Sequence, residues 1–119
     1  MTILAIDQGT TSTRAVEVSP DGAVRIVRTI AHRQIYPRPG WVEHDPEELL
    51  ASISASIEAA GAVDAVGLDN QGESCLAWDA ETGKPISPVI VWQDERTSDE
   101  TERLLSEGAE ALTLTRAGL

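Results

Sequence analysis

Residues 5–16 read AIDQGTTSTRAV, a polar turn between two apolar segments. Ile3 to Ile6 is a short apolar run typical of a strand buried on both faces, and Arg14 to Val18 follows as a second strand. A strand that delivers Asp7 into a turn of glycine and hydroxyl residues places a carboxylate beside backbone N–H and hydroxyl donors. This combination suits a nucleotide phosphate tail with Mg²⁺, which prefers carboxylates and retained waters. A threonine-rich turn with a solvated aspartate is the alternative, and the tripeptide DQG alone favours that alternative.

The residues that follow predict a three-strand antiparallel meander. Ser19 to Gly22 reads SPDG, in which proline sets φ at the second position of a turn and Asp-Gly tolerates the later angles. Residues 23–35 then read as a long third strand. Tight turns between successive strands predict that the three strands pair antiparallel.

A helix is predicted to begin at Asp45, after a loop rich in proline and glycine. Asp45 suits the N-cap and Pro46 the first helical position, and acidic residues follow near the positive end of the helix dipole. The helix is expected to end before Gly61. Its buried stripe is predicted from apolar residues at helical spacing: Leu49, Leu50, Ile53 and Ile57.

The second half of the chain alternates strands and helices, which completes an α/β order. The expected elements are a buried strand over 65–68, a strand over 74–78 paired with a later one across the turn at 79–84, a strand over 89–92, a helix over 95–106 ended by Gly108, and another helix from 109 to 117. Cys75 falls in the 74–78 segment and is predicted to be a buried strand residue.

Length, charge and cysteine content limit the class of protein. The 119 residues have room for one domain with a modest core. The net charge of −11 makes the chain a poor match for nucleic acid or an anionic membrane, because both reward clustered Lys and Arg. Cys75 is the single cysteine, which excludes an internal disulfide framework and fits a reducing compartment. The sequence does not start with a basic segment followed by an apolar stretch, as a signal peptide does. No apolar run approaches the roughly 20 residues that span a bilayer. The sequence therefore predicts a soluble, cytoplasmic protein with no nucleic-acid or membrane partner.

Five blocks of the sequence stand in an order and spacing shared by one known family: AIDQGTTSTRA, IYPRPGWVEHDPEEL, DNQGES, WDAETGKPI and VIVWQDERT. In these blocks the chain resembles the FGGY carbohydrate kinases, most of all the glycerol kinases. The resemblance implies a ribonuclease-H-like α/β fold of the actin, hexokinase and Hsp70 ATPase superfamily, with a mixed sheet that starts with the antiparallel meander and is flanked by helices. It also implies that residues 1–119 are the first part of a sugar-binding N-terminal domain, with the remainder and a C-terminal domain absent. The full-length protein would be a homo-oligomer.

The resemblance assigns the hairpin at the start of the chain to Mg²⁺ and ATP. Asp7 would hold the metal, and five residues would contact the phosphates: Gly9, Thr10, Thr11, Ser12 and Arg14. Mg²⁺ and a guanidinium beside the transferring phosphate stabilise its charge. The implied activity is ATP-dependent phosphorylation of a hydroxyl of a polyol or sugar. The general base would be an aspartate beyond residue 119, so the isolated chain is predicted to be inactive. The alternative is a non-catalytic or degenerate nucleotide-binding module of the actin-like superfamily.

The substrate side departs from the glycerol kinases at Gly72. Those enzymes read Asn-Gln-Arg-Glu-Thr where residues 70–74 read Asn-Gln-Gly-Glu-Ser, and their Arg and Glu bind the polyol hydroxyls. Glu73 keeps the carboxylate, whereas Gly72 offers no donor and leaves space, which counts against glycerol and for a larger polyol or sugar. Trp92 would pack on the carbon face of the substrate, with core packing as the alternative. The implied substrate-binding set is Asp69, Gln71, Gly72, Glu73 and Trp92, and for Asp69 a turn-capping role is equally open.

The remaining polar residues of these blocks are predicted to be structural. Asp94 and Arg96 read as a pair near the pocket, and His44 as a loop-stabilising hydrogen-bond partner rather than a base. Trp41 and Glu43 lie in a block typical of the family but are assigned no catalytic task.

Overall fold

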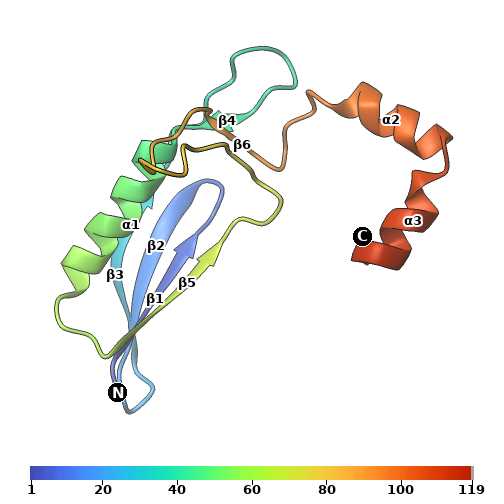
Figure 1. The fold of residues 1–119 in the computed structure, drawn as a ribbon. Helices are drawn as coiled ribbons and strands as arrows, with labels where there is room; N and C mark the ends of the chain where they lie inside the picture. The colour runs from blue at the N-terminus through green and yellow to red at the C-terminus, as the bar shows by residue number, and fades with distance from the viewer. Residues whose placement is uncertain (119) are drawn as a thin grey trace.

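The computed structural model describes residues 1–118, which form a sheet covered by one long helix and an arm of two shorter helices (Figure 1). The sheet has four strands in the order β3-β2-β1-β5: β1 (Ile3–Gln8), β2 (Ser12–Val18), β3 (Val24–Ala31) and β5 (Ala65–Asn70). β1, β2 and β3 pair antiparallel, and β5 pairs parallel with β1. The predicted mixed sheet that starts with an antiparallel meander is therefore confirmed.

The meander follows the prediction at its second turn and departs from it at its end. The Gly22 N–H donates to the Ser19 carbonyl at 2.9 Å, and Gly22 has a φ of 84°, which glycine adopts without strain. The third strand ends at Ala31 and not at Ile35, because Ala31 is already paired with Ser12, the first residue of β2. Beyond it the chain turns away, and Ile35 pairs instead with Glu43.

The long helix α1 (Pro46–Ala60) begins and ends as predicted. Asp45 accepts a hydrogen bond from the Glu47 N–H at 2.9 Å with its Oδ1, as an N-cap residue does. Gly61 stands at the C-terminal end with a φ of 74°. The helix lies against β1, β2 and β3 and covers one face of the meander (Figure 1).

The buried face of α1 differs from the predicted apolar stripe. Leu49, Ser52 and Ser56 are buried, whereas Leu50 and Ile57 are 60% and 43% exposed. The serines can be buried because each satisfies its hydroxyl on the helix itself: Ser52 Oγ donates to the Leu49 carbonyl at 2.7 Å and Ser56 Oγ to the Ser52 carbonyl at 2.8 Å. Small side chains therefore lie between the helix and the sheet, and two of the large ones lie on its flank.

The core centres on β1 and β2, and β5 lies outside it. Leu4 and Ile6 are fully buried under α1, and Ala15 of β2 joins them. Val66 and Leu68 are in register with Leu4 and Ile6 but are 48% and 57% exposed. The prediction of a buried strand over 65–68 is wrong for this chain because β5 is an edge strand, and α1 does not reach across it.

The segment after β5 is more irregular than the sequence predicts. Its regular part is a two-stranded pairing of β4 (Glu43–His44) with β6 (Val89–Ile90), so the strand expected over 89–92 is shorter. Residues 74–78 form no strand but make single bridges, Cys75 with Ile90 and Trp78 with Pro85. Cys75 is exposed, which corrects the expectation of a buried residue. The turn at 79–84 is present, closed by the Asp79 N–H donating to the Lys84 carbonyl at 2.8 Å.

The last two helices form an arm that extends away from the sheet (Figure 1). α2 (Ser98–Ser106) begins three residues later than predicted, and α3 (Ala109–Ala117) follows after Gly108, whose φ is 82°. They pack on each other and bury no residue completely, and the molecule measures 53 × 32 × 30 Å. Among residues 1–118, no helix is both long and apolar enough to cross a membrane.

Candidate functional site

An open cavity of about 390 Å³ lies where β1 and β5 end. Its lining comes from the β1–β2 hairpin, from the loop after β5 and from the segment after β6: Asp7, Gly9, Thr10, Asn70, Gln71, Gly72, Glu73 and Trp92. Residues proposed for the phosphates and residues proposed for the substrate therefore share one cavity. Asn70 was not among the predicted site residues, although the block DNQGES contains it.

The hairpin is a tight turn held by backbone hydrogen bonds. The Gly9 N–H donates to the Ser12 carbonyl at 3.0 Å, and the Gln71 N–H donates to the Gln8 carbonyl at 3.0 Å. A Cβ at Gly9 would stand 3.4 Å from the Ser12 carbonyl oxygen, so a side chain here would lie in contact with the turn backbone. These bonds hold the hairpin and the loop after β5 side by side at the mouth of the cavity.

Asp7 is the middle residue of a row of charged side chains across the sheet. It is in register with Arg14 on β2 and with Asp69 on β5, and all three lie on the face opposite α1. Arg14 and Asp69 do not line the cavity but flank the residue that does. Asp69 lies within β5, one residue before its end, and both readings of its side chain, a substrate contact and a turn cap, stay predictions.

The carboxylates of Asp7 and Asp69 suit a magnesium ion that keeps several waters better than a metal ion bound by protein groups alone. The described residues contain no group of three or more His, Cys, Asp or Glu side chains that could hold a metal ion. Mg²⁺ usually keeps several waters and takes one or two protein carboxylates together with the phosphates of a substrate. Two aspartates in register on neighbouring strands supply that number of carboxylates.

The four hydroxyl residues of the hairpin divide between the cavity and the core. Thr10 lines the cavity, and Thr11 and Ser12 lie beside it without lining it. Thr13, which was not predicted to have a role, is fully buried, and its Oγ1 lies 2.7 Å from both His32 Nε2 and Ser52 Oγ. The fourth hydroxyl therefore ties the hairpin to α1 and cannot contact a ligand. The alternation of β2 predicts this, because Thr13 shares the inward face with Ala15.

Trp92 forms a wall of the cavity and contacts the hairpin. Its side chain is 53% exposed, so the core-packing alternative is wrong. The indole N–H donates to Thr10 Oγ1 at 3.0 Å, across 82 residues of sequence. Glu73, which also lines the cavity, has a φ of 64° and is the single non-glycine residue with positive φ in the described chain. Such strained conformations cost about 1–2 kcal/mol and concentrate at functional sites.

A family comparison agrees with this geometry. The model of the N-terminal domain of the FGGY family of carbohydrate kinases matches residues 2–119. The chain belongs to this family. The resemblance stated from the sequence blocks is thereby confirmed.

Curated relatives of this FGGY chain include glycerol kinases. The glycerol kinase of Allorhizobium ampelinum is 48% identical over 127 residues, which cover 98% of this chain and 25% of that protein. The glycerol kinase of Gloeobacter violaceus is also 48% identical, over 98% of this chain and 24% of its own length. The chain therefore spans about a quarter of the length of these relatives.

Solved structures of a glycerol kinase and a xylulose kinase share the fold. A Plasmodium falciparum glycerol kinase with ADP is 31% identical, with a TM-score of 0.70 over 86% of this chain and 22% of that one. A ligand-bound xylulose kinase from Lactobacillus acidophilus is 19% identical, with a TM-score of 0.90 over 98% of this chain and 25% of that one. The second likeness shows the fold alone, and it confirms the predicted α/β fold class with its mixed sheet and flanking helices.

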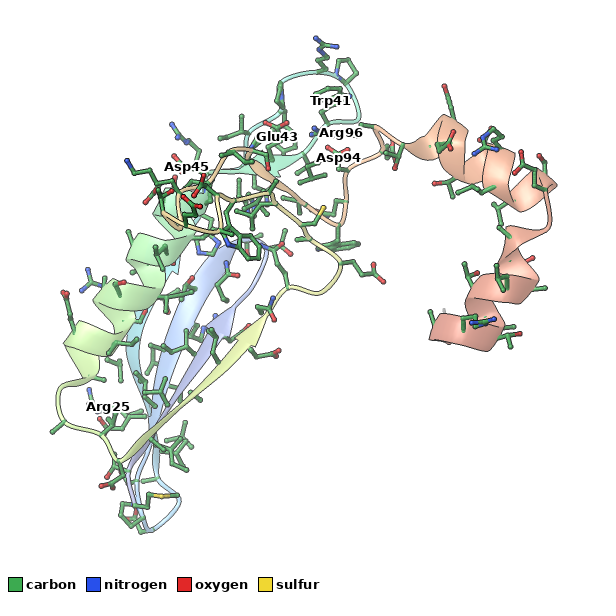
Figure 2. All side chains as sticks on the ribbon, in the orientation of Figure 1. Arg25, Trp41, Glu43, Asp45, Asp94 and Arg96 are labelled. Atoms are coloured by element: carbon green, nitrogen blue, oxygen red, sulfur yellow. The ribbon has the colours of Figure 1, made fainter. Side chains whose placement is uncertain are left out.

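In this FGGY chain, Arg96 joins the segment after β6 to the residues around β4 (Figure 2). Arg96 Nε donates to Asp94 Oδ1 at 2.7 Å and Arg96 Nη2 to Glu43 Oε1 at 2.8 Å, and the guanidinium lies 3.9 Å from the centre of the Trp41 ring. Asp94 Oδ2 accepts from the Val42 N–H at 2.6 Å. The Arg96 guanidinium holds the pKa of Asp94 well below its usual range. The predicted structural pair is confirmed, and Trp41 and Glu43 gain a structural task that the sequence did not reveal.

Replacing Arg96 with methionine is expected to lower the free energy of unfolding by about 2 kcal/mol, because the Asp94 carboxylate, 2% exposed, loses its charged partner. Far-UV circular dichroism in urea measures this change without relying on Trp41 fluorescence. Arg103→Met is the matched control, since Arg103 pairs with Glu100 and Glu107 on the surface of α2, where such pairs contribute at most about 1 kcal/mol. Equal urea midpoints for the two variants would contradict the role given to Arg96.

Two buried histidines lie beneath the hairpin of this FGGY chain. His32 and His44 are 9% and 1% exposed, and their ring centres are 5.8 Å apart. Burial lowers the pKa of both rings, for His44 with a smaller contribution from His32, while the Glu48 carboxylate opposes the shift. Both rings are therefore neutral in the folded chain under conditions where unfolded histidines begin to take up protons.

The free energy of unfolding is expected to fall as the pH is lowered from about 7.5 to about 5.5. The lowered pKa of each histidine means that the unfolded chain, with an ordinary histidine pKa of 6.5, binds more protons than the folded chain in this range. Urea midpoints across the range measure the slope, and most carboxylates titrate below it. A double variant, His32→Gln with His44→Gln, is expected to flatten the slope, and an unchanged slope would contradict this origin.

Proposed function

We propose that this chain is the first part of the N-terminal domain of an ATP-dependent kinase that phosphorylates a hydroxyl of a polyol or sugar. The supporting observation is the shared cavity, in which Asp7 and Thr10 of the hairpin face Glu73 and Trp92. A phosphoryl donor and a hydroxyl acceptor must meet within about 3–3.5 Å for transfer, so their binding groups must line one space. Family membership and the relatives named glycerol kinase support the same reaction class.

On the nucleotide side, Asp7 and Asp69 are proposed to hold a hydrated Mg²⁺. When bound, this ion would neutralise charge that develops on the phosphates. The backbone N–H groups and hydroxyls of the hairpin from Gly9 to Ser12 are proposed to donate to phosphate oxygens, with Arg14 supplying a guanidinium nearby. Gly9 has no side chain to cover the backbone N–H groups of this turn, so an anion can approach them closely.

On the acceptor side, the loop after β5 is proposed to bind substrate hydroxyls. The Glu73 carboxylate accepts hydrogen bonds from hydroxyls, and the Gln71 amide both donates and accepts. The exposed face of Trp92 is proposed to pack against the carbon skeleton of the substrate. Gly72 contributes space, since a Cβ there would meet no atom within 4 Å.

A chimaeric enzyme tests the proposed function. Residues 1–119 would replace the matching quarter of the Allorhizobium ampelinum glycerol kinase, and ADP release would be measured with three-, four- and five-carbon polyols and with sugars. We expect ATP-dependent turnover of at least one acceptor by the chimaera and none by residues 1–119 alone. A folded chimaera that binds ATP but phosphorylates no acceptor would contradict the proposal and support the non-catalytic nucleotide-binding module instead.

A further inference from the structure

We propose that Ser74 is a positioning residue that couples the substrate loop to the phosphate hairpin, an inference that rests on the proposed function. Ser74 lies between Gln71 and Trp92, and each of these side chains lines the cavity while Ser74 itself does not. Ser74 Oγ lies 3.1 Å from Gln71 Oε1 and 3.1 Å from the Trp92 backbone nitrogen. One hydroxyl thus joins the loop after β5 to the segment after β6.

The direction of each hydrogen bond around Ser74 follows from donor chemistry. The Trp92 backbone nitrogen can only donate, so Ser74 Oγ accepts from it and its own proton is free for Gln71 Oε1. With its oxygen towards Ser74, the Gln71 amide presents Nε2 to His44 Nδ1, 3.4 Å away. The Nδ1 atom of a neutral His44 accepts this bond, so the chain of bonds continues into the buried histidine.

The same chain reaches the hairpin through the side chain of Trp92. The indole Nε1–H can only donate, so Thr10 Oγ1 accepts it at 3.0 Å. The hydroxyl proton of Thr10 is then available to a phosphate oxygen in the cavity. The bonds run from His44 through Gln71, Ser74 and Trp92 to Thr10. They fix the position of the Trp92 indole ring and leave the proton of the Thr10 hydroxyl free to donate.

Loss of the Ser74 hydroxyl would release both neighbours at once. In Ser74→Ala the Trp92 backbone N–H loses its acceptor and Gln71 Oε1 loses its donor, so the amide no longer has one preferred orientation. Ser74→Thr keeps the hydroxyl and serves as the conservative rescue. Ser54→Ala is the matched control, because Ser54 Oγ donates only to the Leu50 carbonyl on the exposed side of α1.

The first measurement reads the position of Trp92 without enzyme activity, by NMR of its indole N–H in residues 1–119. The signal is assigned with Trp92→Phe among the three tryptophans of the chain. In Ser74→Ala we expect the indole signal to shift and its exchange with water to speed up roughly fivefold, because the Trp92 backbone loses the hydrogen bond to Ser74 that helps to hold the indole against Thr10. Ser74→Thr and Ser54→Ala are expected to keep the parent signal and exchange rate.

The second measurement is made in the chimaera. Ser74→Ala is expected to lower kcat/KM for the acceptor roughly tenfold, mainly through KM, with recovery in Ser74→Thr and no change in Ser54→Ala. An unchanged indole signal in Ser74→Ala, or the same loss of kcat/KM in Ser74→Thr, would overturn the positioning role. The indole signal could change in Ser74→Ala and recover in Ser74→Thr while the chimaera phosphorylates no acceptor. That result would support the positioning role and contradict only the proposed function.

Discussion

Replacing Asp7 with asparagine in the chimaeric kinase is expected to lower kcat by about 10²–10³-fold while the chain keeps its fold. A neutral amide is a poor partner for Mg²⁺, which binds hard anionic oxygens. Asp7 is exposed at the end of β1 and lies next to Asp69 in register, so its replacement removes one of two neighbouring carboxylates without opening the core. Turnover measured as a function of Mg²⁺ concentration should show a higher Mg²⁺ requirement as well as a lower maximum.

A second aspartate provides the control for this prediction. Asp21 lies in the exposed turn between β2 and β3, where its Oδ1 accepts only from the Ala23 N–H at 3.2 Å. Asp21→Asn removes the same charge from a turn next to the same sheet and is expected to leave kcat and the Mg²⁺ requirement unchanged. If Asp7→Asn also stays within a few-fold of the parent, as a rough limit from transition-state arithmetic, the assignment of the metal to Asp7 is wrong.

Replacing Gly72 with arginine is expected to shift the preference of the chimaera towards glycerol by roughly 10- to 100-fold in kcat/KM, relative to four- and five-carbon polyols. The parent is expected to favour the longer acceptors, because the glycerol kinases that this chain resembles carry an arginine here. An arginine presents a fork of charged donors that suits adjacent hydroxyls, and its bulk takes the room of a longer substrate.

The structure supports the feasibility of this substitution. A Cβ at position 72 would meet no heavy atom within 4 Å, and the backbone there is not in the left-handed region, so arginine fits without strain. Gly72 lines the cavity beside Glu73, whose carboxylate is the nearest charged partner in the sequence. The new side chain therefore enters the space where substrate hydroxyls are proposed to bind.

Gly72→Leu separates the loss of space from the gain of donors. Leucine fills part of the cavity but donates no hydrogen bond, so it is expected to weaken the use of longer polyols without improving the use of glycerol. Steady-state kinetics of the parent, Gly72→Arg and Gly72→Leu with each acceptor make the comparison. If the parent already prefers glycerol, the argument from Gly72 fails and glycerol becomes the expected acceptor.

The turns and helix ends of this chain could be predicted well because neighbouring residues encode them. Asp45 and Pro46 specify a helix start through one side-chain acceptor and one preset φ, and the structure shows the predicted N-cap bond. The SPDG turn closes as expected for the same local reason. The candidate site was also largely predictable, since the AIDQGTT and DNQGES blocks supply most of the cavity lining.

Burial could not be predicted from spacing alone. Leu50 and Ile57 have the period of a buried stripe, yet Ser52 and Ser56 occupy the contact with the sheet. The helical period shows which residues share a face of α1, but the position of the sheet decides which face is buried. Buried serines are tolerated on that face because their hydroxyls donate to the helix backbone. The same holds for β5, whose apolar residues are exposed because no element of residues 1–118 covers that edge.

The local sequence therefore specifies the hairpin, the helix start and the membership of the family, because each depends on residues close together in the chain. Contacts between distant segments depend on packing: Trp92 donates to Thr10 across 82 residues, and Thr13 meets Ser52 across 39. No spacing within a block encodes such a contact, since it joins segments that only the folded chain brings together. For that reason the sequence names most of the residues of the candidate site, and the fold determines which of them face the cavity and which support it from below.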